Sequence, residues 1–236
     1  RRVAVAVEIE HPHDWKGGHP ELRRDVMHLE YGALKRGYAW VFPKGDHLSV
    51  GAGVFQPEKL SQQHAGGIGA HLRDIVFRYL EHLDVPYVRD EIRFHAHPIP
   101  LWTSREPLHT RNGRILLAGD AAGLVNPMFG DGIFHAVRSG IVAGECLLEG
   151  TPTRYTQRIN AGVARPFPSA ARLATLAYDW NSLVYDQGIC RPRATHLAAS
   201  LLCGQSITPG LMSFLMGRLK GALKQSGAAP QPDHSA

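Results

Sequence analysis

The chain has 236 residues, of which 44% are hydrophobic and 20% charged, a composition typical of globular proteins that excludes fibrous and disordered classes. Its formal net charge of +5 is spread along the sequence without a long basic run, which argues against nucleic-acid binding. The sequence has no signal peptide and no apolar run of the roughly 18 residues that a spanning helix needs, and its three cysteines are far apart. We therefore expect a cytoplasmic protein with reduced thiols.

The first predicted elements are strands. Apolar side chains alternate along residues 3–10, which predicts a half-buried strand, and residues 26–31 predict a second, shorter one. His11 and His13 form a His-x-His pair in the loop between them, and residues 95–97 contain another. Neither pair has further ligands at a suitable spacing, so we expect no metal site.

Residues 37–55 predict a β-hairpin with a Pro-Lys-Gly-Asp turn. Aromatic side chains alternate on one face of its first strand, and glycines alternate on the second: Tyr38, Trp40 and Phe42, then Gly51 and Gly53. Aromatic residues opposite glycines make a flat apolar wall. Since ordinary sheet cores are also rich in aromatic residues, the pattern leaves both a core and a binding surface open.

Residues 60–83 carry an apolar stripe at helical spacing and predict a helix, whose start is delayed by Gly66, Gly67 and Gly69. Residues 84–86 end this helix. Residues 93–99 then predict a further strand.

A short apolar run at residues 115–118 has the character of a buried parallel strand. It ends at Gly119-Asp120, where open α/β sheets bind their ligands. A loop with Pro127 follows, then Gly130-Asp131-Gly132 and a helix that begins at Ile133. Glycines before a helix let a ligand approach the N–H groups at the positive end of its dipole. Together with the acid, this pattern suits a polyhydroxylated anionic cofactor, and an ordinary strand–helix unit is the alternative.

This helix has small residues along one face, which we expect to pack closely on a sheet: Ala136, Ser139, Gly140, Ala143 and Gly144. Helical periodicity continues at residues 155–163, 170–185 and 194–203. Residues 211–223 form a basic amphipathic helix, which either packs on its own domain or lies in a membrane interface. The last residues, 225–236, have the composition of a flexible tail.

Two stretches resemble one known family. GDAAGLVNPMFGDGIFHAVRSG, from Gly119, resembles the second FAD-binding motif of the flavoprotein hydroxylase-like superfamily, in the form found in geranylgeranyl reductases. GYAWVFPKGDHLSVGAG, from Gly37, is similar to a hairpin signature of the same family. The resemblance implies that Asp120 contacts the ribityl chain of FAD and that the backbone from Gly130 to Ile133 lies near the flavin pyrimidine edge. The implied cofactor set is Gly119, Asp120, Pro127, Gly130, Asp131, Gly132 and Ile133, and the implied substrate wall is Tyr38, Trp40 and Phe42.

The resemblance also implies an α/β fold, with the C-terminal part of a FAD-binding Rossmann-like domain, an antiparallel-sheet substrate domain and a helical C-terminal region. We expect the sheet domain at residues 1–110, the last strand and helix of the FAD-binding domain at 111–150, the helical region at 151–224 and the tail at 225–236. No Gly-x-Gly-x-x-Gly loop follows a strand, although the family carries such an ADP-binding unit first. We therefore expect the C-terminal portion of a longer protein, inactive as an isolated fragment.

The implied activity is reduction of carbon–carbon double bonds in a geranylgeranyl or polyprenyl chain by hydride transfer from reduced FAD, with NAD(P)H or ferredoxin as the electron donor. Such a substrate would bring the protein to the cytoplasmic face of a membrane. The first alternative is a FAD-dependent monooxygenase or halogenase, which shares the FAD motif but lacks the hairpin signature. The second is a fragment without activity of its own. His47, Tyr38 and Asp131 are open candidates for the proton donor, and the catalytic residues and oligomeric state stay unknown.

Overall fold

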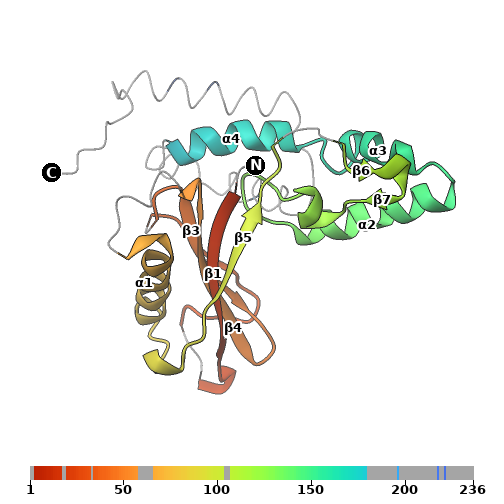
Figure 1. The fold of residues 1–236 in the computed structure, drawn as a ribbon. Helices are drawn as coiled ribbons and strands as arrows, with labels where there is room; N and C mark the ends of the chain where they lie inside the picture. The colour runs from red at the N-terminus through yellow and green to blue at the C-terminus, as the bar shows by residue number, and fades with distance from the viewer. Residues whose placement is uncertain are drawn as a thin grey trace. The chain divides into compact units, whose positions relative to one another are not determined.

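The computed structural model describes residues 3–17, 20–32, 34–57, 66–103 and 107–179, together with residues 196, 217 and 221 (Figure 1). Its contacts divide the chain into two compact units, with the division between Ile99 and Pro100. We call Val3–Ile99 the sheet unit and the part from Pro100 onward the helical unit. Each unit is built around its own hydrophobic core.

The sheet unit is a five-stranded sheet in the order β2-β3-β4-β1-β5 (Figure 1). Its strands are β1 (Val3–Pro12), β2 (His28–Glu30), β3 (Gly37–Pro43), β4 (His47–Phe55) and β5 (His95–Pro100). The pairs β2–β3, β3–β4 and β4–β1 are antiparallel. The predicted hairpin is confirmed, because β3 and β4 pair along their length and the Lys44 N–H donates to the His47 carbonyl across the turn at 2.9 Å.

The two faces of this sheet differ, because successive side chains of a strand point to opposite sides. One face is aliphatic and packs against helix α1 (Gly67–His82). The side chains buried between this face and the helix include Val7, Ile9, Val41 and Val50 from the strands and Leu72, Val76 and Leu80 from α1. The helix begins at Gly67 because Gly66 and Gly67 adopt positive φ angles of 85° and 79°, which is the late start that the glycines predict. The aromatic side chains of β3 lie on the opposite face.

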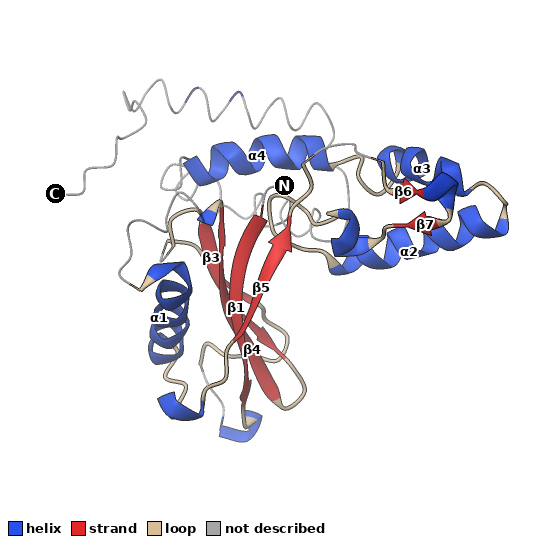
Figure 2. Ribbon diagram, viewed as in Figure 1, coloured by secondary structure: helices blue, strands red, loops and turns tan. Residues whose placement is uncertain are grey.

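In the described part of the helical unit, a short hairpin is followed by three α-helices (Figure 2). Its elements are β6 (His109–Thr110), β7 (Ile115–Leu116), α2 (Ile133–Leu148), α3 (Tyr155–Ala161) and α4 (Phe167–Asp179). Cys146, Tyr155, Ile159 and Phe167 are fully buried in its core. The Tyr155 hydroxyl donates to the Leu117 carbonyl at 2.8 Å, so α3 fixes the segment that follows β7. Burial raises the pKa of Tyr155 to about 12, which keeps the phenol a hydrogen-bond donor.

The expectation of a buried parallel strand at residues 115–118 is wrong. The strand ends at Leu116, pairs antiparallel with β6 and leaves Ile115 41% exposed. The cause is the Arg111-Asn112-Gly113 turn, whose three residues all have positive φ angles and fold the chain back. Asn-Gly is a strong hairpin signal, so the sequence did contain the information for this turn.

The remaining expectations lie partly outside the described residues. These are the helices at 194–203 and 211–223, the end of the helix at 170–185, the tail, and Cys190 and Cys203. Cys146 is buried and forms no disulfide. No helix within the described part of the chain is both long and apolar enough to cross a membrane. The domain bounds expected from the sequence, at residues 110, 150 and 224, stay predictions.

Candidate functional site

The segment from Gly119 to Ile133 forms one continuous structure: a 3-10 turn at Gly119–Ala122, a closed loop and the first residue of α2. All seven residues that the sequence assigns to a cofactor lie here: Gly119, Asp120, Pro127, Gly130, Asp131, Gly132 and Ile133. The three residues assigned to a substrate lie on β3, in the sheet unit.

The turn after β7 depends on two glycines. Gly119 and Gly123 adopt φ angles of 54° and 65°, in the left-handed region that favours glycine. The Gly123 N–H donates to the Asp120 carbonyl at 2.9 Å, and the Leu124 N–H donates to the Gly119 carbonyl at 3.0 Å. The exposed carboxylate of Asp120 therefore projects from a hydrogen-bonded turn rather than from a loose loop.

Ser139 fastens this turn to α2. The Gly119 N–H donates to Ser139 Oγ at 2.9 Å, and the Ser139 hydroxyl donates to the Ala136 carbonyl at 2.9 Å. Ser139 is fully buried, and a Cβ added to Gly119 would lie 3.0 Å from the Cβ of Ala136. The small residues at 119 and 136 thus let the turn approach the helix closely, and Ser139 satisfies the N–H that this approach buries.

The loop between the turn and α2 is closed by Asn126, a buried residue that the sequence analysis did not assign. Its side-chain Oδ1 accepts the Met128 N–H, its carbonyl accepts the Gly130 N–H, and its N–H donates to the Asp131 carbonyl, at 2.8 to 2.9 Å. From α4, the Tyr178 hydroxyl donates to the Met128 carbonyl. The Asn-Pro dipeptide at 126–127 is a turn signal that could have identified this residue.

Gly132 lets the carboxylate of Asp120 lie close to the N-terminus of α2. A Cβ at this position would lie 3.1 Å from Asp120 Oδ1 and 3.3 Å from a methyl carbon of Val125. A side chain at position 132 would therefore crowd the carboxylate beside the first turn of α2. An acceptor for hydroxyl groups next to a helix N-terminus is the donor and acceptor set that a flavin nucleotide needs, so these residues fit FAD.

Asp131, just before α2, and His135, in its first turn, form an electrostatically coupled pair. Burial raises the pKa of Asp131, while the His135 charge and the Ile133 N–H act in the opposite direction. Burial likewise lowers the pKa of His135, and Asp131 opposes that shift. Desolvation thus disfavours the charged form of both groups, and His135 is neutral at pH 7.

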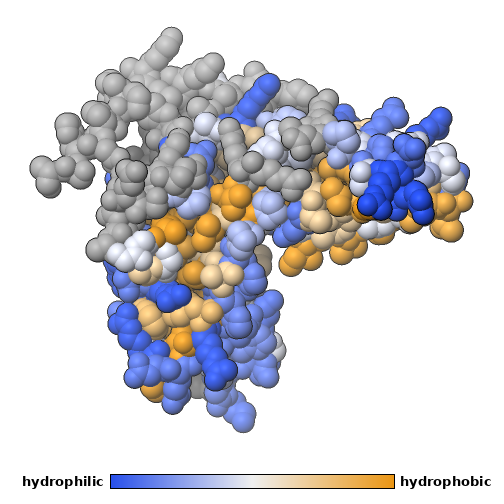
Figure 3. All heavy atoms as spheres, viewed as in Figure 1, coloured by the Kyte–Doolittle hydropathy of each residue, from blue (hydrophilic) through white to orange (hydrophobic). Residues whose placement is uncertain are grey.

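The small-residue face of α2 does not pack as a whole on a sheet. Ala136 and Ser139 contact the Gly119 turn, but Gly140 and Gly144 are exposed, and a Cβ on either would meet no atom within 4 Å among the described residues. Neighbouring apolar side chains are exposed too, so that an apolar strip is visible along α2 (Figure 3). We call this strip, Ile133, Val137, Ile141 and Leu148, the α2 apolar strip.

The aromatic face of the sheet unit is built by pairing large residues with small ones. Trp40 lies opposite Gly51, and a Cβ on Gly51 would lie 2.1 Å from an indole carbon. The ring centroids of Tyr38 and Phe42 lie 5.9 and 6.0 Å from that of Trp40. These contacts place the three predicted residues side by side in one half-buried aromatic row.

Glu8 is an acidic residue on this same face that the sequence analysis missed. It pairs in register with Gly51, which in turn pairs with Trp40, and its side chain is half-buried. The described residues give its carboxylate no hydrogen-bond or ion-pair partner. The signal was an acidic residue between two buried apolar residues of β1, Val7 and Ile9.

His47, one of the candidate proton donors, is engaged at the end of the hairpin. Its Nε2 lies 2.9 Å from Glu10 and its Nδ1 lies 2.7 Å from Asp46. Tyr38 belongs to the aromatic row, and Asp131 precedes α2. No group of three or more His, Cys, Asp or Glu side chains gathers as a metal site within the described ranges.

No family model matches the chain. Among proteins compared by sequence, the geranylgeranyl diphosphate reductase of Synechocystis sp. is 36% identical over 147 residues, which are 62% of this chain and 32% of that protein. The digeranylgeranylglycerophospholipid reductase of Methanococcus vannielii is 28% identical over 130 residues, 52% of this chain and 30% of that protein. The chain thus spans about a third of the length of these relatives.

Solved structures support the fold. A geranylgeranyl bacteriochlorophyll reductase-like protein from Thermoplasma acidophilum has a TM-score of 0.56 at 17% identity, over 96% of this chain and 54% of that one. A flavoprotein/dehydrogenase from Cytophaga hutchinsonii gives 0.65 at 14% identity, over 95% and 56%. The flavin-dependent brominase Bmp2 gives 0.57 at 15% identity, over 95% and 56%. The α/β fold expected from the sequence is confirmed, and over about half of its length the chain is similar in sequence to geranylgeranyl reductases.

Proposed function

We propose that the protein containing this chain is an FAD-dependent oxidoreductase that reduces carbon–carbon double bonds of a geranylgeranyl or polyprenyl chain. The names of the sequence relatives support this substrate class, since they denote reductases of geranylgeranyl diphosphate and of a digeranylgeranyl phospholipid. The observation that carries the cofactor is the close approach of Asp120 to Gly132 at the start of α2.

In this proposal the residues from Gly119 to Ile133 bind the flavin end of FAD. Asp120 would accept hydrogen bonds from the ribityl hydroxyls, and the backbone from Gly130 to Ile133 would hold the flavin ring. Ser139 and Asn126 hold these groups in position before the cofactor arrives, which lowers the entropy cost of binding. Bound FAD would supply the hydride, with NAD(P)H or ferredoxin as the source of its electrons.

The aromatic row of Tyr38, Trp40 and Phe42 binds the prenyl chain and keeps water away from it. An isolated double bond offers little polarity for a protein to act on, so positioning of the alkene contributes most of what the protein adds. One alkene carbon accepts the hydride and the other needs a proton. Glu8, beside Gly51 on this face, is our candidate for the group that delivers it.

Two alternatives compete with this proposal. The likeness to a flavin-dependent brominase supports a flavin monooxygenase or halogenase, whereas the hairpin from Gly37 to Gly53 resembles the reductases. The second alternative is a fragment that binds no flavin and has no activity of its own. This alternative concerns the isolated chain and not the longer protein.

A flavin-binding experiment separates these cases. The 236-residue chain and a version extended at its amino terminus to the length of its relatives are purified, loaded with FAD and examined for the visible flavin band. We expect flavin in the extended protein, with Asp120→Asn weakening its binding. The loaded protein is then reduced without oxygen and mixed with geranylgeranyl diphosphate.

We expect the product to gain two hydrogens for each double bond reduced, with oxidation of an equal number of flavins. Absence of flavin from both proteins would overturn the cofactor assignment. Incorporation of an oxygen atom into the substrate when oxygen is present, with no reduced product formed in its absence, would favour the monooxygenase alternative. Flavin bound tightly by the short chain would show that its own residues suffice for the site.

A further inference from the structure

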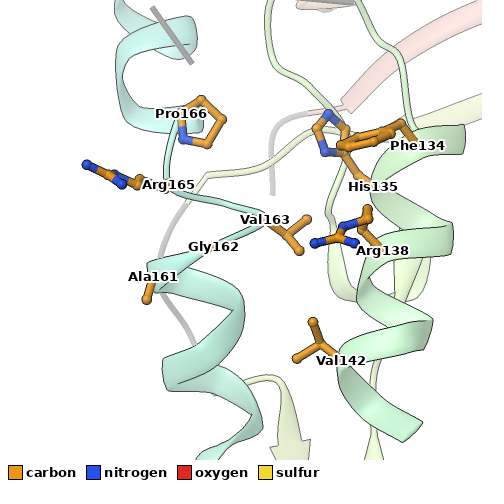
Figure 4. A pocket seen from close by; sticks show the side chains of 9 residues that line it. All are labelled: Phe134, His135, Arg138, Val142, Ala161, Gly162, Val163, Arg165 and Pro166. Atoms are coloured by element: carbon orange, nitrogen blue, oxygen red, sulfur yellow. The ribbon is translucent and has the colours of Figure 1, made fainter. Parts of the chain in front are cut away.

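A cavity of about 300 Å³ lies in the helical unit between α2 and the connection from α3 to α4 (Figure 4). This volume is at the small end of the range for ligand pockets, about 300–1,000 Å³. Helix α2 supplies Phe134, His135, Arg138 and Val142, α3 supplies its last residue, Ala161, and the connection supplies Gly162, Val163, Arg165 and Pro166. None of these residues belongs to the proposed cofactor or prenyl-chain sets.

The charged side chains at this cavity are all cationic. Figure 4 shows the Arg138 side chain extending from α2 toward Val163, while the Arg165 side chain points outward at the rim. The lining residues include no carboxylate, and no described residue forms an ion pair with either arginine. Arg158 differs, since its Nη1 lies 3.0 Å from Glu149. Among the described residues, neither arginine at the cavity therefore has a partner of opposite charge.

His135 gives the cavity a second feature that points to a ligand. The residue is only 2% exposed, yet both ring nitrogens are buried without a hydrogen-bond partner among the described residues. An unsatisfied buried polar group is costly, and native proteins leave few of them. Phe167 packs edge-on against the ring, with centroids 4.7 Å apart, so the imidazole is held in place rather than free to turn to solvent.

We propose that this cavity binds a phosphate or diphosphate group, which Arg138 and His135 hold and which Arg165 attracts at the rim. Arginine is well suited to phosphate because its planar guanidinium can donate two parallel hydrogen bonds. A ring N–H of His135 donates a further bond and so gains the partner that it lacks. The apolar lining from Val142, Val163 and Pro166 accommodates the carbon portion of a phosphate ester.

Binding of inorganic diphosphate to the purified chain tests this site by calorimetry. Arg138→Gln should weaken binding about tenfold or more, because it removes charge-assisted hydrogen bonds. Arg172→Gln is the matched control, since Arg172 is an exposed arginine of α4 outside the cavity. This variant should bind diphosphate as tightly as the wild-type chain does. Arg138 is exposed, so its loss should leave the fold intact.

Nuclear magnetic resonance of ¹⁵N-labelled histidine gives an independent readout. Diphosphate should shift the ring nitrogen signals of His135, and His135→Phe should weaken diphosphate binding while the thermal unfolding transition is kept. The site is overturned if the wild-type chain binds no diphosphate, if Arg138→Gln and Arg172→Gln weaken binding equally, or if the His135 signals do not respond.

The source of the phosphate follows from two further ligand pairs. Tighter binding of geranylgeranyl diphosphate than of geranylgeraniol, lost in Arg138→Gln, identifies a prenyl diphosphate head group. Tighter binding of NADP⁺ than of NAD⁺, lost in Arg138→Gln, identifies the additional phosphate of the nucleotide. Binding of inorganic diphosphate, without a preference within either pair, identifies a free oxyanion. Each of these results supports the site. None of them requires flavin, so this inference and the reductase proposal fail separately.

Discussion

At the scale of single residues, the functional surfaces depend on where side chains are absent. Gly51 is covered by the indole of Trp40, and Gly132 leaves the space that the Asp120 carboxylate uses. Neither position has a positive φ angle, so the reason for glycine is space and not backbone conformation. Neighbouring glycines on the same strand therefore need not be equivalent.

Gly51→Ala should disturb the aromatic row, whereas Gly53→Ala should not. An alanine Cβ at position 51 would lie 2.1 Å from an indole carbon of Trp40, but one at position 53 would lie no closer than 3.5 Å to any atom. Overpacking of this kind costs about 1–3 kcal/mol. We expect Gly51→Ala to lower the urea midpoint and alter the tryptophan signal in near-ultraviolet circular dichroism. Equal effects of the two substitutions would contradict the packing described for Trp40.

Glu8→Gln tests the proton-delivery role. If Glu8 gives the proton to the second alkene carbon, the flavin-loaded enzyme should lose about 10²-fold or more in kcat with little change in KM. Glu10→Gln is the control, because Glu10 lies on the same face but pairs with His47 at 2.9 Å. A loss shared by both variants, or a loss confined to KM, would assign Glu8 a role in substrate binding or in the fold instead.

At the scale of elements, α2 organises the helical unit. Its first turn receives the loop that Asn126 closes, its inner face holds the Gly119 turn through Ser139, and a third side contains the cavity with His135 and Arg138. One helix thus connects the proposed flavin site and the proposed phosphate site. Both depend on how firmly the helix holds the residues before it.

Ser139→Ala should loosen that connection. The substitution leaves the buried N–H of Gly119 without its acceptor, which costs about 1–3 kcal/mol. We expect a lower urea midpoint and weaker FAD binding by the extended protein. Thr175→Ala serves as the control, because the Thr175 hydroxyl also donates to a carbonyl of its own helix but is exposed, so its loss should cost no more than about 0.5 kcal/mol. Similar losses in both variants would mean that Ser139 does not anchor the turn.

At the scale of the whole molecule, the sequence predicted the elements whose determinants are local. The aromatic alternation of β3, the Pro-Lys-Gly-Asp turn and the glycine-delayed start of α1 all depend on residues within a few positions of one another. The run from Gly119 to Ile133 was also recognisable, because its glycines mark tight turns.

The features that sequence reasoning missed depend on contacts between distant residues. The strand at residues 115–118 was expected to lie in a parallel sheet. Instead, the turn at Asn112-Gly113 folds the chain back, so that β7 pairs antiparallel with β6. The lack of hydrogen-bond partners for the His135 ring follows from its burial in the folded chain, where Phe167 packs against it. Glu8 is recognised as part of the aromatic face only from the strand register, in which it pairs with Gly51, and Gly51 pairs with Trp40. Glu8 and Gly51 are 43 positions apart in the sequence. Register and burial are properties of the folded chain.

The α2 apolar strip has a practical consequence for handling the protein. Ile133 is 81% exposed and Leu148 91%, and the glycines between them allow another surface to approach the helix backbone closely. Contiguous apolar patches of this kind drive association in water. Preparations of the isolated chain should therefore bind hydrophobic dyes, self-associate as concentration rises and need detergent or a covering partner for long storage.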